Sequence, residues 1–271
     1  MHQSESQHAT ERVARLKAGL NVDVLSDWGG NDSDWNPGTW TLAELDRLND
    51  ALGLLTQAMG GSETFARNLG GVKVLKGDLG SHGGEALAHE VRLSSKHSFS
   101  AWTVIHEFAH AWDANHGWQL SVALEQYTGG FTHKFLGKVK RFLLLGDANV
   151  KGSEDAPGKR GRKPGCNAAG YFYGDQPSGA NWAFNRVEDF AESVAMYIGW
   201  KGNNPLSDHA HKRITRYELA NGEKDPLFGA KEYWADYATY FYPPNGDYTS
   251  TLRWQFVDVL MKGKIEVAGK V

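Results

Sequence analysis

The chain has 271 residues, of which 41% are hydrophobic, and a formal net charge of −3. This length and apolar content suit one large domain or two subdomains around a cleft. The slightly acidic charge gives no electrostatic basis for binding nucleic acid or an anionic membrane, so neither is expected as a partner. The longest apolar runs, such as FLLL at 142–145, are far too short to span a bilayer. The single cysteine, Cys166, cannot form an internal disulfide.

The start of the chain, MHQSESQHATERV, is polar and lacks the apolar core of a secretory signal. An intracellular protein and a mature or excised domain of a secreted one are both compatible with this start. The compartment is therefore left open, and a monomer is favoured.

The segment TWTLAELDRLNDALGLLTQAMGG (Thr39–Gly61) gives the clearest early helix. Thr41, followed three residues later by Glu44, predicts a capping box, and Gly60–Gly61 predicts the end of the helix. Leucines recur at steps of three and four and would form one apolar face: Leu42, Leu45, Leu48, Leu52 and Leu55.

Two short strands are predicted next, at Gly71–Gly77 and at Ala88–Ser95, with a turn at SHGG between them. A helix that begins near Ser98 or Ser100 follows. Together these elements predict an α+β protein in which helices dominate. We expect an N-terminal subdomain at 1–117, a helical C-terminal subdomain at 118–271, and an active-site cleft between them.

The helix after these strands carries the segment TVIHEFAHAWDANHG (Thr103–Gly117). Residues four apart on a helix lie one turn above each other, so His106 and His110 can direct ring nitrogens at one zinc ion. Glu107 would lie beside the metal, where it can take a proton from a zinc-bound water. Asp113, three residues after His110, could accept a hydrogen bond from an imidazole N–H. The alternative is an ordinary helix that carries two histidines with protein partners.

A hydrolytic zinc site needs a third protein ligand, and the best acidic segment is NRVEDFAES (Asn185–Ser193). Glu188 and Glu192 share one helical face with Ala191 and Ala195. Burying two carboxylates among alanines is costly unless each has a partner, and a metal for one and a hydrogen-bond donor for the other would supply them. The alternative makes Glu188 a capping-box residue three after Asn185 and leaves Glu192 exposed.

The segments HEFAHAWD and NRVEDFAES together resemble the gluzincin metallopeptidases. The resemblance is closest to the subgroup of the anthrax lethal factor catalytic domain and the bacterial Pro-Pro endopeptidases. It implies a zincin-like fold with a small mixed sheet, an edge strand beside the active-site helix and a helix-rich C-terminal part. It also implies that Glu188 is the third ligand of one zinc ion and that Glu192 supports the site by hydrogen bonding. The predicted strand at Ala88–Ser95 lies where these enzymes have the edge strand that pairs with an extended peptide.

Two features depart from this subgroup. The second motif begins 188 − 110 = 78 residues after the last histidine, a long separation that the basic segment Lys151–Gly165 helps to fill. The subgroup also has a tyrosine seven residues before the ligand glutamate, and this chain has Asn181 there. Tyr173 is therefore assigned to stabilise the tetrahedral intermediate, with Tyr171 as a second candidate. The alternative for either tyrosine is packing.

The resulting hypothesis is a zinc-dependent endopeptidase that acts on a peptide or protein substrate. Two alternatives stay open. The first is a binding module rich in Trp and Tyr, of which the chain has ten each, with a structural or vestigial zinc. The second is a zinc hydrolase that cleaves a bond other than a peptide bond.

Overall fold

The computed structural model describes residues 3–25, 39–80, 82–96, 99–128, 186–201, 206–207, 248–250 and 252–263. The chain divides into two compact units, Met1–Gln119 together with Met261–Val271, and Leu120–Leu260. The described residues form a helix-rich mixed α and β structure with one four-stranded mixed sheet. This agrees with the predicted fold class at that level.

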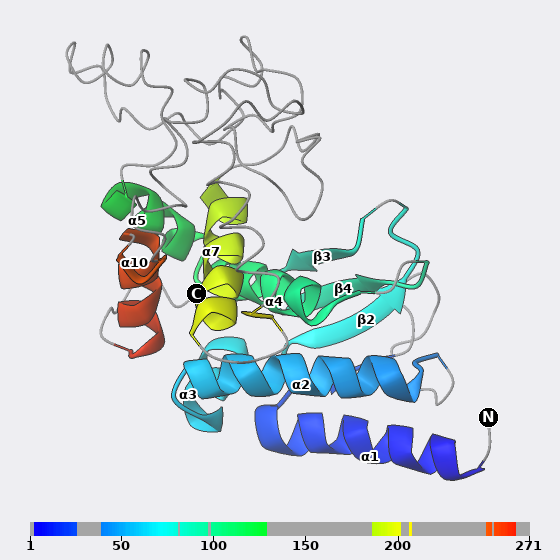
Figure 1. Cartoon of the computed structure of the whole chain (residues 1–271). Helices are drawn as coiled ribbons and strands as arrows, with labels where there is room; N and C mark the ends of the chain where they lie inside the picture. The colour runs from blue at the N-terminus through cyan, green and yellow to red at the C-terminus, as the bar shows by residue number, and fades with distance from the viewer. Residues whose placement is uncertain are drawn as a thin grey trace, which may run out of the picture. The chain divides into compact units, whose positions relative to one another are not determined.

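The described residues of the first unit form four helices: α1 (Gln3–Leu20), α2 (Leu42–Ala58), α3 (Ser62–Leu69) and α4 (Ala101–Asn115). Helix α2 packs against α1, α3 and α4, and α4 also contacts α3. Figure 1 shows α1 and α2 running side by side. The predicted apolar stripe of α2 is confirmed for four of its five leucines, since Leu45, Leu48, Leu52 and Leu55 are fully buried. Leu42, in the first turn, is half-buried, and Ala51 is buried beside the leucines. Helices α1 and α3 were not predicted.

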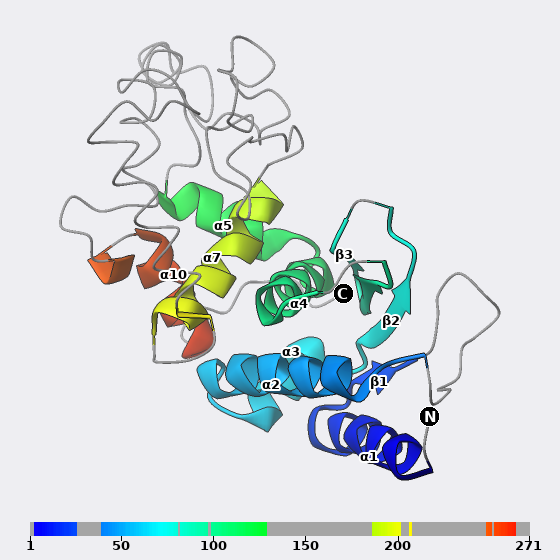
Figure 2. The same cartoon turned by 45° about the vertical axis from the view of Figure 1, so that its right-hand side comes forward.

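The sheet has the strand order β1-β2-β4-β3. Strands β1 (Asp23–Val24), β2 (Lys73–Gly77) and β4 (Glu90–Ser94) are parallel, and β3 (Gly84–Leu87) pairs antiparallel with β4. Helix α4 packs against both β3 and β4. Figure 1 shows β3 beyond β4 at the edge of the sheet, and Figure 2 shows β3 beside α4.

The predicted strand at Ala88–Ser95 is present, but its predicted position at the edge of the sheet is wrong. Its core residues form β4, which lies between β2 and β3, so the edge beyond it belongs to β3. The sequence of β3, GEAL, has neither β-branched nor aromatic residues and gives no strand signal of its own. Its strand conformation comes from pairing with β4, in which Gly84 lies opposite Leu93 and Leu87 opposite Glu90.

The predicted capping box of α2 is confirmed and extends to the sheet. The Thr41 hydroxyl accepts a hydrogen bond from the Glu44 N–H at 3.2 Å, and the Glu44 carboxylate accepts one from the Thr41 N–H at 2.8 Å. The same carboxylate accepts a 2.7 Å hydrogen bond from the largely buried Nζ of Lys76 on β2. Glu44 therefore ties the start of α2 to the sheet.

Helices with aromatic side chains form the described part of the second unit. They are α5 (Gln119–Thr128), α7 (Arg186–Trp200) and α10 (Leu252–Met261), with a 3-10 turn η2 at Tyr248–Ser250. The Trp254 ring lies 4.4 Å from the Tyr197 ring and 6.1 Å from the Tyr248 ring. The predicted helix at 131–145 and the basic segment 151–165 lie outside the described residues.

Within the described part of the chain, no helix combines the length and the apolar character needed to cross a membrane.

We expect Glu44→Gln to lower stability near neutral pH and to have little effect in acid. Burial raises the pKa of Glu44, but hydrogen bonds from Lys76 and Thr41 and the Lys76 charge outweigh it, so the pKa is lowered overall. A lowered carboxylate pKa contributes stability above the unfolded-state pKa, and this is lost as pH falls through the folded-state pKa. The expected loss near neutrality is about 1 kcal/mol.

Urea unfolding at several pH values measures this loss. Glu63→Gln, at an exposed position in the first turn of α3, is the matched control. A Glu44→Gln penalty that stayed constant down to strongly acidic pH would contradict the assigned role of the ionised carboxylate.

Candidate metal centre

The helix that carries the histidines is fixed at its start and buried along its length. The Ser100 hydroxyl caps α4 by accepting a 3.1 Å hydrogen bond from the Thr103 N–H, so Ser100 is the cap of the two predicted candidates, Ser98 and Ser100. Sequence patterning predicts one apolar side, on Ile105, Phe108, Ala109 and Trp112, with the histidine side free to face a cleft. The structure instead buries the residues of α4 on every side from Val104 to Ala114, the histidines included.

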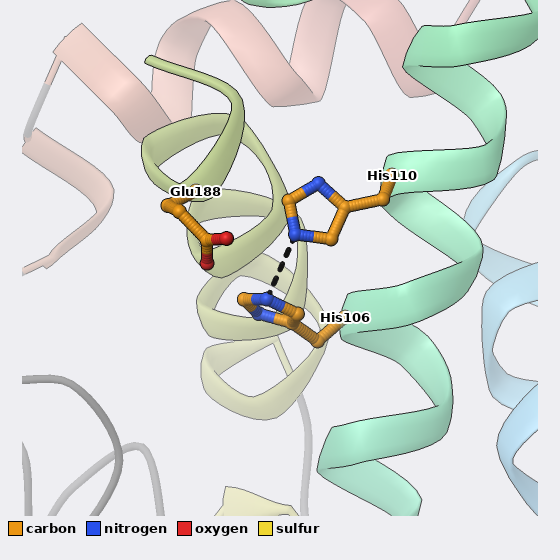
Figure 3. A group of neighbouring side chains, drawn as sticks. All are labelled: His106, His110 and Glu188. Atoms are coloured by element: carbon orange, nitrogen blue, oxygen red, sulfur yellow. Dashed lines mark hydrogen bonds between the residues drawn. The ribbon is translucent and has the colours of Figure 1, made fainter. Parts of the chain in front are cut away.

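His106 and His110 direct their Nε2 atoms at each other from successive turns of α4. The two nitrogens are 3.0 Å apart, and the rings lie nearly perpendicular, with centroids 4.7 Å apart (Figure 3). Two nitrogens on one tetrahedral zinc ion, each bonded at 2.0–2.1 Å, would be about 3.3 Å apart. A separation larger by a few tenths of an ångström would therefore let both rings bind one ion.

Glu107 directly follows His106, and its side chain faces strand β3 of the same unit. Its side chain is only 6% exposed and lies directly against Gly84 of strand β3. The carboxylate thus stays on the side of α4 that meets the edge of the sheet. A general base next to a metal-bound water requires such a placement near the metal ligands but outside them.

In the part of the chain that the structure describes, the side chains that could hold a metal ion are those of His106, His110 and Glu188. Each offers one ligand atom, a ring nitrogen from either histidine and a carboxylate oxygen from Glu188 (Figure 3). Two imidazoles and one carboxylate form a donor set typical of catalytic zinc, in which a fourth position stays open. Glu188 belongs to the second unit, so its coordination of an ion held by the histidine pair is part of the proposal below.

Four polar or charged residues follow Arg186 within about the first two turns of helix α7. Glu188 is partly exposed, whereas Asp189, Glu192 and Ser193 are buried. The alternative in which Glu192 is simply an exposed residue is therefore wrong. The other alternative, a capping box between Glu188 and Asn185, involves a residue outside the described range. Glu188 does lie in the first turn of the helix.

Asp189 forms a buried ion pair that the sequence reasoning missed. Arg253 of α10 donates from Nε to Oδ1 at 2.6 Å and from Nη2 to Oδ2 at 2.8 Å, and both side chains are at most 2% exposed. Burial raises the pKa of Asp189 while the Arg253 charge and its hydrogen bonds oppose that rise. The sequence signal was an arginine in the otherwise mainly apolar segment LRWQFVDVLM, with no indication of its partner.

Burial also raises the pKa of the Tyr248 phenol, with the charge of Asp189 contributing. Tyr248, which is fully buried, therefore stays protonated across the physiological range. Together with Ser193, whose hydroxyl donates to Asp189 at 3.4 Å, it forms part of the polar interior of the second unit. This interior fixes the residues next to Glu188 on α7.

The remaining predicted residues have different outcomes. Asp113 lies one turn after His110 and is fully buried, as a residue that supports an imidazole should be. Its hydrogen bond to a histidine ring stays a prediction. Tyr173, Tyr171 and Asn181 lie outside the described residues, and so the assignment of the group that stabilises the intermediate also stays a prediction.

No known protein family, curated protein or solved structure matches this chain. The resemblance to gluzincins therefore rests on the two sequence motifs and stays a prediction.

We expect Arg253→Met to destabilise the second unit by about 3–5 kcal/mol, because it leaves the buried Asp189 carboxylate without its cation. The double variant Asp189→Leu/Arg253→Met removes both charges and should recover most of this loss. Urea unfolding of the full chain measures both values. A double variant as unstable as Arg253→Met alone would show that side-chain packing, and not the uncompensated charge, accounts for the effect.

Proposed function

We propose that this chain is a zinc-dependent endopeptidase of gluzincin type, with a zincin-like fold. The observation that carries the proposal is the pair of Nε2 atoms 3.0 Å apart on a buried helix, with Glu107 directly after the first histidine. A carboxylate oxygen of Glu188 would complete a set of three protein ligands. The His-Glu-x-x-His spacing accounts for the ligand geometry and for the choice of Glu107 as the base.

In this proposal His106, His110 and Glu188 hold one zinc ion. Bound zinc would polarise the scissile carbonyl and make a water nucleophilic near neutral pH. Glu107 accepts the proton of the attacking water and later delivers it to the leaving amine. Glu192 and Asp113 hold the ligands in position, and Tyr173 donates a hydrogen bond to the developing oxyanion.

The edge of the sheet favours a peptide as the substrate. Strand β3 is the outermost strand of the described sheet and packs against α4. An extended peptide can add to such an edge by backbone hydrogen bonds, which are independent of its side chains. The role that the sequence assigned to residues 88–95 therefore passes to Gly84–Leu87.

The described aromatic residues give little support to the alternative of a binding module. Most of those in the second unit pack against one another, as Tyr197, Trp254 and Tyr248 do. Among the described residues, Trp118 and Tyr127 are the large aromatic side chains with substantial exposure. No group of exposed rings is formed there to bind a glycan or a protein partner.

We expect Glu107→Gln to retain zinc and to lose at least about a hundredfold in kcat, because the amide keeps the shape of the side chain but cannot accept the proton. Cleavage of an unfolded protein and of a peptide library, analysed by mass spectrometry, measures the activity, and metal analysis measures the zinc. Peptide turnover near that of the wild type would contradict the mechanism. Cleavage of a bond other than a peptide bond would favour the alternative hydrolase.

The two glutamates of α7 should differ in their effect on zinc content. Glu188→Ala removes a proposed ligand and should lose stoichiometric zinc, whereas Glu192→Ala should weaken zinc binding and retain the site. Metal analysis after dialysis against a weak chelator compares the two variants. Because they lie four residues apart on one helix, each is the matched control for the other. Loss of zinc from Glu192→Ala alone would exchange their roles.

A further inference from the structure

Strand β3 begins with a glycine that has the Glu107 side chain directly against it. A Cβ atom built on Gly84 would lie 2.5 Å from Cγ of Glu107 and 2.8 Å from both Cδ and Oε1. All three distances are shorter than carbon–carbon and carbon–oxygen contacts allow. The space that a side chain at position 84 would need is therefore occupied by the carboxylate that we propose as the general base.

The backbone conformation does not explain this glycine. Gly84 lies outside the left-handed region in which glycine is favoured, and it pairs in regular antiparallel register with Leu93. The neighbouring Gly83 also lies outside that region, and a Cβ atom there would meet Thr103 at an ordinary 3.6 Å. At Gly84 the constraint is the close approach of Glu107.

We propose that Gly84 is a positioning residue for Glu107, and this inference rests on the proposed function. With only a hydrogen at position 84, the Glu107 carboxylate can lie against the backbone of the edge strand, where an extended peptide would bind. Any side chain at this position would force the carboxylate away from that edge. Sequence patterning gives no indication of this role, since Gly84 is the last residue of the predicted SHGG turn.

Because the backbones of α4 and β3 are held in place, the Glu107 side chain is the group that would move to make room for a side chain at position 84. Helix α4 is buried from Val104 to Ala114, and β3 is held by its hydrogen bonds to β4. A Glu side chain can rotate out of its preferred conformation at modest energetic cost. The variant Gly84→Ala should therefore fold and bind zinc, but with Glu107 displaced. A displacement of about 1 Å in a catalytic group can reduce the rate by about a hundredfold.

Steady-state kinetics on a peptide that the wild type cleaves tests this displacement. We expect Gly84→Ala to lower kcat at least tenfold, with zinc content retained and KM changed much less, because the ligands and the strand edge remain. Gly83→Ala, one residue earlier, should leave kcat within about twofold of the wild type. Equal kcat values for the two variants would overturn the inference while the proposed function stood.

A second measurement detects the same contact without any catalytic activity. Glu107→Gln keeps Cγ and Cδ in place, whereas Glu107→Ala removes the three atoms that lie nearest to the new Cβ. We expect Gly84→Ala to lower Tm by at least about 2–4 °C, relative to Gly83→Ala, in the wild-type and Glu107→Gln backgrounds. The penalty should disappear in the Glu107→Ala background.

An equal Tm penalty in all three backgrounds would overturn the inference, because the steric conflict would then not involve Glu107. If the wild type cleaved no peptide but the Tm cycle gave the expected pattern, the contact between Gly84 and Glu107 would stand. In that case the proposed function would fail, and with it the catalytic meaning of the contact.

Discussion

The central constraint in this structure is the burial of two imidazole rings that face each other on one helix. Successive turns of α4 place the Nε2 atoms of His106 and His110 3.0 Å apart, with both rings largely excluded from water. Buried polar nitrogens require partners, and here each ring supplies one for the other. In the hydrogen bond between them, the tautomers decide which Nε2 donates and which accepts. Two imidazoles that each present an Nε2 lone pair at this point would instead bind one metal ion.

Helix α7 of the second unit also buries a polar group that needs a partner. Asp189 is buried beside the proposed ligand Glu188, and the Arg253 guanidinium meets it with two parallel hydrogen bonds. A bidentate pair fixes both position and rotation of a carboxylate. It therefore holds the first turn of α7 in a defined orientation. A single charged contact from a flexible side chain would leave more freedom to the residues next to it.

Local patterns in the sequence predicted the parts of the fold that depend on neighbouring residues. Spacings of three and four residues predicted the capping box of Thr41 and Glu44 and the leucine stripe of α2. The serines at 98 and 100 indicated where α4 begins. Strand β3 was missed because GEAL has no strand preference and is ordered by β4. The Asp189–Arg253 pair was missed because 64 residues separate its members, and nothing in either segment identifies the other.

The proximity of Gly84 to Glu107 shows why a motif alone underdetermines an active site. The His-Glu-x-x-His spacing specifies which residue types share a helical turn, but it says nothing about the surface opposite the glutamate. Here that surface is the backbone of the edge strand, which is exposed to Glu107 because position 84 has no side chain. A base held against an edge strand would lie where a bound peptide backbone must pass. The absence of one methyl group would then determine the position of the base relative to the substrate, and the helix alone does not fix it.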